Sequence, residues 1–388
     1  MDDRIYPAKY SNTVIIPLST ISFILNAMVR FSVPVLLPFI ISSMKVDLFQ
    51  GSLLITAYWI GYTVFQIPGG VLSDIFGTAV VNKISFAILT ILFSLLYFLI
   101  DIYMAVFLIQ LALGSVSALI YVSDASLVQK WSSRSKRSTA LGIYQSGFFI
   151  GASIGEYFII SSYGISKFMP FLVVIPMLAI TAILNIIFIS DPKSTGKRIG
   201  ISRKILFPAI LRFSAGFAYI GFLAMFSSIL VYDFKVPENQ IFFYSWIPAF
   251  LGIVSSPLGG AASARIRNGR LLLAALPVLA IAIFMLAILY VNFRIAIFLS
   301  AMLGLLYGFY AGPSMSMASD VSSSDASLSS SSSILNLSSQ SGGMISPAIM
   351  GYSYSVYGSF AIGMVAVSVI SMALVLTSVF YLAKYGIT

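Results

Sequence analysis

The stretch Gly69-Gly70-Val71-Leu72-Ser73-Asp74-Ile75-Phe76-Gly77 lies between two apolar segments, near 52–73 and 83–100. Its glycines allow two helices to approach closely, because they carry no side chain. Asp74 is suited to the N-terminus of a helix or to a pair with a basic loop residue. Each flanking segment has roughly the 20 apolar residues that a bilayer span needs. The stretch therefore predicts a tight turn between two membrane helices.

Composition extends this prediction to the whole chain. Of 388 residues, 59% are hydrophobic and 9% are charged, and the mean hydropathy is +1.00, whereas soluble domains carry about 25% charged residues. The sequence has neither Cys nor His, which argues against disulfides, haem and the usual zinc sites. No phosphate-binding GxxxxGK[ST] motif occurs. We expect an all-α membrane protein that is not an enzyme and has no cofactor and no metal.

Twelve apolar segments are long enough to be transmembrane helices. The loops between them are short, which leaves no room for a large soluble domain, and the N-terminus lacks a cleavable signal pattern. The segments lie near 13–41, 52–73, 83–100, 103–128, 139–162, 168–190, 206–232, 241–263, 271–291, 295–318, 334–356 and 359–382.

The distribution of basic residues predicts the orientation. Most of the 22 Lys and Arg fall on one side when the N-terminus is placed in the cytoplasm, as the positive-inside rule requires. The opposite side holds Lys45, Lys167, Lys235 and Arg294. Both termini should then be cytoplasmic in a multi-pass protein of the cell (plasma) membrane. The net charge of +10 is explained by the lipid bilayer, with no nucleic acid as partner.

The chain divides into two halves of six predicted spans. The longest basic loop, at 191–205, separates residues 1–190 from residues 206–388. Arg30-Phe31-Ser32 in the first span is repeated as Arg212-Phe213-Ser214 in the seventh, which suggests a duplication. The Ser-rich stretch 322–333 is interpreted as a flexible linker.

The turn at 69–77 resembles the loop signature of the major facilitator superfamily. This resemblance implies two six-helix bundles that expose a central cavity alternately to each side, with Gly69, Gly70, Asp74 and Gly77 in the gate. The basic residues that follow the signature in that family are replaced here by 78–80, Thr-Ala-Val, so that Lys83 is the nearest substitute.

Two further segments are similar to the same family. In the fifth span Gly147, Gly151 and Gly155 recur every four residues, which gives a smooth surface for close helix packing. The segment 342–351 in the eleventh span, with its Gly-Gly pair and Pro347, is similar to the family's eleventh helix.

A narrower resemblance concerns the anion:cation symporter branch, whose members carry sugar acids and other organic anions. It rests on 62–70 with Arg30 upstream, and on Tyr144-Gln145-Ser146-Gly147 within 131–151. Val29, Ser117 and Gln110 depart from charged positions of the known branches, so their proton-coupling groups are missing or moved.

Charged residues inside spans are functional-site candidates. Arg30 lies too deep to reach the cytoplasm, and it either grips an anion with two parallel hydrogen bonds or forms an ion pair with Glu156. Glu156 either carries a coupling proton or neutralises Arg30. Asp124 is a second proton candidate. Arg212, about two turns into its span, either reaches the cytoplasmic surface or forms a second anion clamp.

Polar residues within spans complete the predicted site. We expect Asn26, Tyr62, Tyr144, Asn336 and Gln340 to join Arg30 in binding substrate. The predicted function is secondary transport of a small organic anion, a carboxylate or sugar acid, coupled to a proton by a monomer. An exporter of drugs or apolar solutes and a non-transporting receptor or scaffold are the alternatives.

Overall fold

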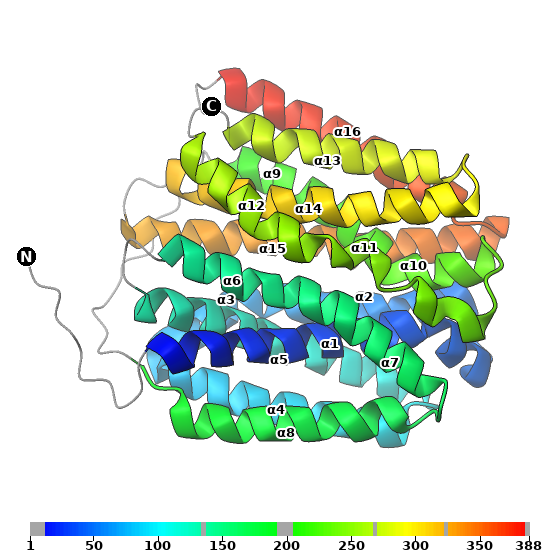
Figure 1. Cartoon of the computed structure of the whole chain (residues 1–388), viewed down its shortest axis with the longest axis horizontal. Coiled ribbons are helices and arrows are strands. Elements are labelled where there is room, and N and C mark those ends of the chain that lie inside the picture. The colour runs from blue at the N-terminus through cyan, green and yellow to red at the C-terminus, as the bar shows by residue number, and fades with distance from the viewer. Residues whose placement is uncertain (1–11, 133–136, 192–204, 267–269, 322–324, 385–388) are drawn as a thin grey trace, which may run out of the picture.

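The computed structural model describes residues 12–132, 137–191, 205–266, 270–321 and 325–384, and this part of the chain forms helices and turns without a strand. The helices run side by side along the long axis of the molecule (Figure 1). Helix α1 (Asn12–Met44) begins and α16 (Ala361–Lys384) ends at the same end of the molecule. Over its described residues the protein is all-helical, as the composition predicts.

The described residues before the predicted linker form nine helical elements. Helix α2 begins in a capping box, because Asp47 Oδ1 accepts from the Gln50 backbone N–H at 2.7 Å and the Gln50 side chain accepts from the Asp47 backbone N–H at 3.2 Å. The elements are α1 (Asn12–Met44), α2 (Leu48–Val64), α3 (Gln66–Phe76), α4 (Thr78–Leu99), α5 (Tyr103–Trp131), α6 (Arg137–Ile150), the π-helix η1 (Gly151–Gly155), α7 (Glu156–Tyr163) and α8 (Met169–Phe188).

Residues after the predicted linker form the remaining elements. Asp233, directly after the third of them, accepts from the Phe360 backbone N–H at 3.2 Å, just before the last helix begins. The elements are α9 (Leu206–Ala215), the π-helix η3 (Gly216–Ile220), α10 (Gly221–Tyr232), the 3₁₀-helix η4 (Glu238–Phe243), α11 (Ile247–Phe250), α12 (Gly252–Arg265), α13 (Arg270–Ile288), α14 (Phe293–Val321), α15 (Asp325–Tyr357) and α16 (Ala361–Lys384).

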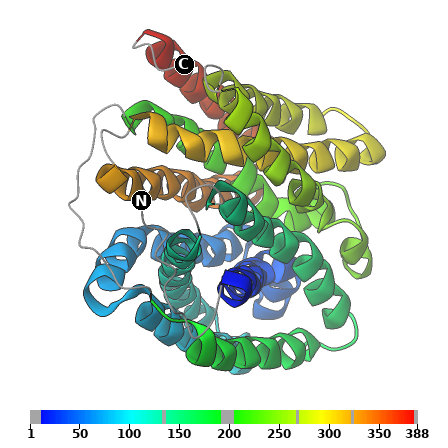
Figure 2. The same cartoon turned by 60° about the vertical axis from the view of Figure 1, so that its left-hand side comes forward.

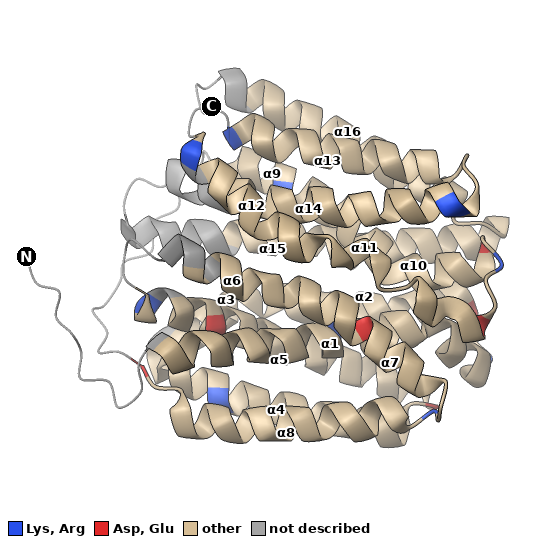
Figure 3. Cartoon of the chain, viewed as in Figure 1, with Lys and Arg blue, Asp and Glu red and all other residues tan. Residues whose placement is uncertain are grey.

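Ten helical stretches within the described residues are long and apolar enough to cross a membrane. The predicted spans 139–162 and 334–356 are not among the ten, yet both are helical, as α6–η1–α7 and α15. Both carry Gly and Ser on surfaces that pack against other helices. Charged residues lie mainly near the two ends of the helices (Figure 3), as a bilayer requires.

Helices pack mainly within the part of the chain to which they belong. Helix α5 contacts α1, α2 and α4 in the first part, and α14 contacts α12 and α13 in the second. Contacts between the two parts come from α15 with α2, α12 with α6 and α1 with α10, and Figures 1 and 2 show the parts one above the other. These pairs of helices make the most extensive contacts between the parts, so an opening at either end would separate them at that end.

The structure bears on the two linkers predicted from the sequence, at 322–333 and at 191–205. The linker predicted at 322–333 is wrong over its described residues, because α15 begins at Asp325 and continues to Tyr357. Serine tolerates a helix when its hydroxyl bonds the carbonyl of the preceding turn, as Ser338 does with Ile334 at 2.9 Å. Most of the basic loop at 191–205 lies outside the described residues.

Candidate functional site

The Arg30 guanidinium lies inside the first part of the molecule, surrounded by aromatic rings. Arg30 is only 3% exposed. Its Cζ atom lies 4.4 Å from the ring centre of Tyr62, 5.3 Å from Trp59, 5.6 Å from Phe148 and 6.0 Å from Tyr58. We call these five residues the Arg30 cage. The rings stabilise the cation through their negative faces.

Helix α2 supplies three of the four rings. Tyr58, Trp59 and Tyr62 share one face because residues separated by three or four positions are neighbours on a helix. This face is held close to α5, since a Cβ atom on Gly114 would collide with the Tyr58 carbonyl oxygen. The close crossing of α2 and α5 therefore fixes the depth at which the rings meet Arg30.

Few hydrogen bonds satisfy the guanidinium. Arg30 Nε donates to the Tyr58 hydroxyl at 3.4 Å, which is long. Its Nη2 atom is buried without a well-aligned hydrogen bond. The Tyr62 hydroxyl lies close to the guanidinium and likewise makes no well-aligned hydrogen bond. No carboxylate of the described residues lies within salt-bridge distance of Arg30. The cage thus holds a buried cation with unused donors.

Glu156 lies apart from the cage. It begins α7 directly after the π-helix η1, and it is 2% exposed with Oε1 lacking a partner. Its electrostatic neighbour is Tyr219 of η3, in the second part of the chain. The next residue, Tyr157, places its ring 6.2 Å from that of Trp246. The described structure shows no Arg30–Glu156 ion pair, and Glu156 adjoins the boundary between the parts.

Asn26 and Tyr144 lie near the cage. Asn26 Nδ2 donates to the Ser117 carbonyl at 3.2 Å, and its Oδ1 has no partner. Tyr144 is linked to Tyr62 through Tyr121, with ring centres 6.2 and 6.4 Å apart. The structure therefore groups Arg30, Tyr62 and Tyr144 in one aromatic cluster, with Asn26 one helical turn from Arg30.

Asn336 and Gln340 occupy a different place. Asn336 Nδ2 donates to Gln66 Oε1 of α3 at 3.1 Å, and Gln340 Nε2 donates to Asn336 Oδ1 at 3.4 Å. The first bond joins the two parts of the molecule. Among the described residues neither side chain has a hydrogen bond to the cage. We call the bond between α3 and α15 the Gln66–Asn336 contact.

The predicted gate stretch forms the end of α3 and the turn into α4. Gly77 adopts φ +92°, which favours glycine. A Cβ atom on Gly69 would lie 3.1 Å from the Leu119 side chain, whereas one on Gly70 would meet open space. The Asp74 side chain lies outside the described residues.

An ion pair closes this turn. Asp191 Oδ2 accepts from the Ala79 backbone N–H at 2.8 Å, and Asp191 Oδ1 lies 3.5 Å from Lys130 Nζ. The carboxylate therefore caps the N-terminus of α4. Lys130 and Asp191 supply the charges here; no ion pair of the described residues involves Lys83, which the sequence suggested.

The three glycines of the fifth predicted span face α1. A Cβ atom on Gly147 would lie 3.1 Å from the Thr20 carbonyl oxygen. One on Gly151 would collide with the Ile24 carbonyl, and one on Gly155 with the Met28 side chain. Helix α6 and η1 can therefore lie directly against the helix that carries Arg30.

The amino-acid sequence of this chain is similar to sequences of a known protein family. The sequence profile described as Major Facilitator Superfamily matches residues 19–347. The chain belongs to this superfamily. A curated relative is the hexuronate transporter of Bacillus subtilis (strain 168), 23% identical over an alignment of 260 residues that covers 62% of this chain and 61% of that protein. The chain thus matches less than two thirds of the relative's length.

Two solved structures share the fold. Both are of a bacterial homologue of the human lysosomal transporter Spinster in inward-facing conformations. The unoccupied form has a TM-score of 0.76 at 14% identity and covers 98% of each chain. The occupied form has a TM-score of 0.73 at 15% identity and covers 96% of this chain and 97% of the other. These two structures show that the fold is shared. Membership of the superfamily, from the profile match, indicates a transporter rather than an enzyme.

Arg212 is buried, so it does not reach the cytoplasmic surface. It is 7% exposed, and its Nε and Nη1 donate to the Leu335 carbonyl at 2.8 Å and the Ser314 hydroxyl at 2.7 Å. The Arg212 Cζ atom lies 5.9 Å from the centre of the Tyr310 ring. Unlike Arg30, it anchors α9 to α14 and α15.

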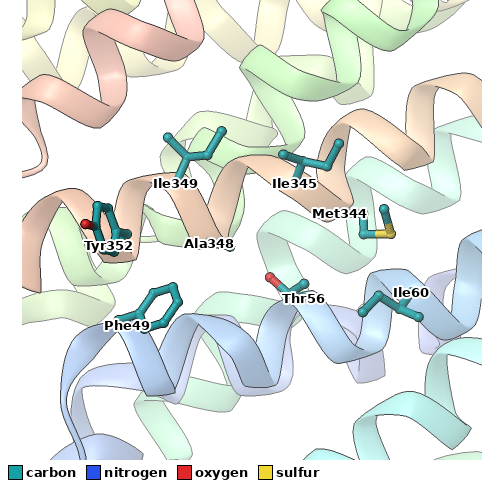
Figure 4. Close-up of a pocket in the computed structure, with 8 residues that line it drawn as sticks. All are labelled: Phe49, Thr56, Ile60, Met344, Ile345, Ala348, Ile349 and Tyr352. Atoms are coloured by element: carbon teal, nitrogen blue, oxygen red, sulfur yellow. The ribbon is translucent and has the colours of Figure 1, made fainter.

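An apolar groove of about 460 Å³ lies between α2 and α15 (Figure 4). Phe49 and Tyr352 face each other across it, with ring centres 5.7 Å apart. Thr56 and Ile60 line it from α2, whereas the cage residues of that helix are absent from its lining. The groove is thus separate from the Arg30 cage.

Sequence reasoning missed several residues of the site. Tyr58, Trp59 and Phe148 form most of the cage, and Gln66 makes the contact to Asn336. The signal for the first two was their spacing from Tyr62, which places three aromatic residues on one helical face. Phe148 had no such signal, because its proximity depends on how α6 packs against α1.

Proposed function

We propose that this superfamily member is a secondary transporter that moves a small organic anion across the cell membrane by alternating access. Twelve helices would form two six-helix bundles, residues 1–190 and 206–388, joined by a cytoplasmic linker at 191–205, with both termini inside. The contacts of α15 with α2, α12 with α6 and α1 with α10 would break and reform as the bundles of the monomer rock.

The unsatisfied Arg30 guanidinium carries this proposal. A buried charge is costly unless it is paired, and the described residues supply no carboxylate for it. A carboxylate on the substrate would accept from Nη2, whose donors are unused. Such charge-assisted bonds are the strong ones in proteins. The substrate would thereby provide the partner that the protein lacks.

The rings of the cage favour a sugar acid over a bare carboxylate. Aromatic faces stack on the C–H faces of a sugar ring. Asn26 Oδ1 has no hydrogen-bond partner, and the Tyr62 hydroxyl, close to the Arg30 guanidinium, makes no well-aligned hydrogen bond. These groups could bind sugar hydroxyls. The weak relationship to a hexuronate transporter supports the same substrate class.

Glu156 is our candidate for proton coupling. A carboxyl group can lose its charge by binding a proton, which an arginine cannot do. Glu156 lies beside Tyr219, across from the second part of the chain, where rearrangement would change its access to water. Its protonation could then follow the conformational cycle without direct contact with Arg30.

The exporter alternative predicts that Arg30 is locked in a salt bridge and that the cavity binds apolar solutes. The unpaired Nη2 atom favours the anion carrier. A receptor or scaffold on the same fold would bind a ligand but not exchange it across the membrane.

Paired sugars test the proposal. Glucuronate and galacturonate should raise the melting temperature of the purified protein, whereas glucose and galactose, which lack the carboxylate, should not. A ligand at a hundredfold excess over Kd stabilises by about 2.7 kcal/mol. Arg30→Gln should abolish the shift, and Arg294→Gln, at an exposed position, should retain it.

Uptake into proteoliposomes distinguishes a carrier from a receptor. Uptake of labelled hexuronate should rise with an inward proton gradient and lose that dependence in Glu156→Gln. The anion proposal would be refuted if acidic and neutral sugars raised the melting temperature equally, or if Arg30→Gln kept the rise seen with the acidic sugars. Binding without uptake would favour the receptor.

A further inference from the structure

A second buried carboxylate, Asp124, lies outside the function proposed above. It projects from α5 with no exposed surface. Asn82 of α4, equally buried, donates from Nδ2 to Asp124 Oδ1 at 2.9 Å and to Ser123 Oγ at 3.2 Å. The hydroxyl of Ser19 on α1 lies beside the carboxyl group. Three helices thus converge on this acid.

The oxygens of this cluster outnumber its donors. Asp124 Oδ2, Asn82 Oδ1 and Ser19 Oγ are buried and make no hydrogen bond of good geometry, although the Ser19 hydroxyl lies close to the carboxyl group. The Asn82 amide has already used both of its protons, and Ser123 donates to the Ile120 carbonyl at 3.0 Å. Buried polar atoms are nearly always satisfied, and an exception points to a water or an ion.

The charge of the cluster is also unbalanced. No Lys or Arg in the described part of the chain lies within salt-bridge distance of Asp124. Lys130, further along α5, pairs with Asp191 instead. An ionised carboxylate fully buried without a positive partner is strongly disfavoured. The cluster therefore lacks one positive charge as well as a partner for its oxygens.

We propose that Ser19, Asn82 and Asp124 form a binding site for one small monovalent cation, Na⁺. One carboxylate balances one positive charge. A divalent ion such as Ca²⁺ takes six to eight oxygens, several of them from carboxylates. The described residues contain no group of three or more His, Cys, Asp or Glu side chains that could hold such an ion. The full burial of the three side chains favours a small ion over a larger one.

A proton on Asp124 is the competing explanation. A protonated carboxyl group gains one donor, and the Ser19 hydroxyl beside it supplies a second. A cation would instead contact all three oxygens at once. The two explanations differ in their response to Na⁺ at constant pH, because only a cation site is stabilised by Na⁺.

The site is linked to the Arg30 cage through tyrosines. Tyr144 lies within electrostatic range of both Asp124 and Arg30, and its hydroxyl donates to the Tyr121 carbonyl at 3.5 Å. Tyr121 in turn adjoins Tyr62 of the cage. If the proposed anion transport holds, Na⁺ here would be a coupling ion. Cation binding itself does not depend on that function.

Sodium-dependent melting tests the site without any substrate. The purified full chain is titrated with NaCl against choline chloride at constant ionic strength and pH, with KCl as a second series. We expect the melting temperature to rise and saturate with Na⁺, and much less with K⁺. Asp124→Asn should lose the Na⁺-dependent rise, and Glu156→Gln should keep it.

Equilibrium binding of radioactive ²²Na⁺ provides an independent readout if Asp124→Asn does not fold. Ser19→Ala should weaken Na⁺ binding about fivefold to tenfold. Ser162→Ala is the matched control, because this buried serine donates to Ile159 within its own helix at 2.9 Å. It should leave Na⁺ binding unchanged.

Several results would overturn the inference. These are identical melting in Na⁺ and choline, a stability that follows pH but not Na⁺, or an unchanged Na⁺ effect in a folded Asp124→Asn. None of these results concerns the rise in melting temperature with hexuronate, which depends on Arg30. Conversely, loss of that shift would leave the Na⁺ titration valid, so the two proposals fail separately.

Discussion

Replacing Asn336 by Ala should open one end of the molecule. The Gln66–Asn336 contact, 3.1 Å long, joins α3 to α15 between the two parts of the chain. Both side chains are buried, and Gln66 Nε2 already lacks a partner. Asn336→Ala would leave the Gln66 side chain without a hydrogen bond to any described residue, and a buried unsatisfied polar group costs about 1–3 kcal/mol.

This cost applies only to the conformation in which the end is closed, because water can satisfy Gln66 once the helices separate. The equilibrium constant for opening should therefore rise by about 5- to 150-fold. An open population of a few per cent would become substantial. The opposite end should gain no opening, since alternating access opens one side at a time.

Spin-label distances can measure this change. The protein contains no Cys, so label pairs need no prior removal of native thiols. Ile75 and Ile266 are exposed at the ends of α3 and α12, on the side of the contact, and Phe98 and Tyr290 are exposed at the other side. Double electron–electron resonance should show a longer component for the first pair only.

A serine on the same helix supplies the control. Ser341 donates to the Leu337 carbonyl within α15 at 2.9 Å, so Ser341→Ala breaks no bond between the parts. It should leave both distance distributions unchanged. The reasoning is refuted if Asn336→Ala also leaves them unchanged, or if Ser341→Ala produces the same longer component.

Two predictions concern stability. Gly114→Ala should destabilise the protein by about 1–3 kcal/mol through overpacking against Tyr58, whereas Gly142→Ala, which meets open space, should be neutral or stabilising in a melting experiment. In the absence of ligand, Arg212→Met should lower the melting temperature because it leaves two buried acceptors without their donor, at about 1–3 kcal/mol each. Arg30→Met should lower it less or raise it, and the opposite order would contradict the roles assigned to the two arginines.

The fold was largely predictable because the bilayer constrains the sequence strongly. Long apolar segments and the low fraction of charge predicted an all-helical membrane protein, and the stretch 69–77 predicted the superfamily that the profile match shows. Local detail was less predictable. A serine-rich segment can form either a helix or a loop. The helical start of α15 at Asp325 therefore depends on contacts that composition does not reveal.

The site was predictable only in part. Arg30 stood out because a charge deep in a span is rare, and Tyr62 because of the motif around it. The partners of Arg30 were not predictable, since they depend on how α2 and α6 lie around α1. Asn336 and Gln340 are polar residues in a span, like Tyr62, yet the structure places them at the Gln66–Asn336 contact. Polarity alone does not distinguish a ligand contact from a contact between helices.

The repeated Arg-Phe-Ser triplet shows how the two halves differ in their use of the same residue. Arg212 has two short hydrogen bonds to buried acceptors, so its charge is accommodated by the protein itself. Arg30 has one long hydrogen bond, an unpaired Nη2 and four aromatic rings, and cation–π contacts of about 0.5–2 kcal/mol compensate only part of its desolvation. A purely structural arginine would be expected to have acceptors of its own, as Arg212 does. On the proposed function, an anion that comes and goes fills the unused donors of Arg30, which is the property a carrier needs.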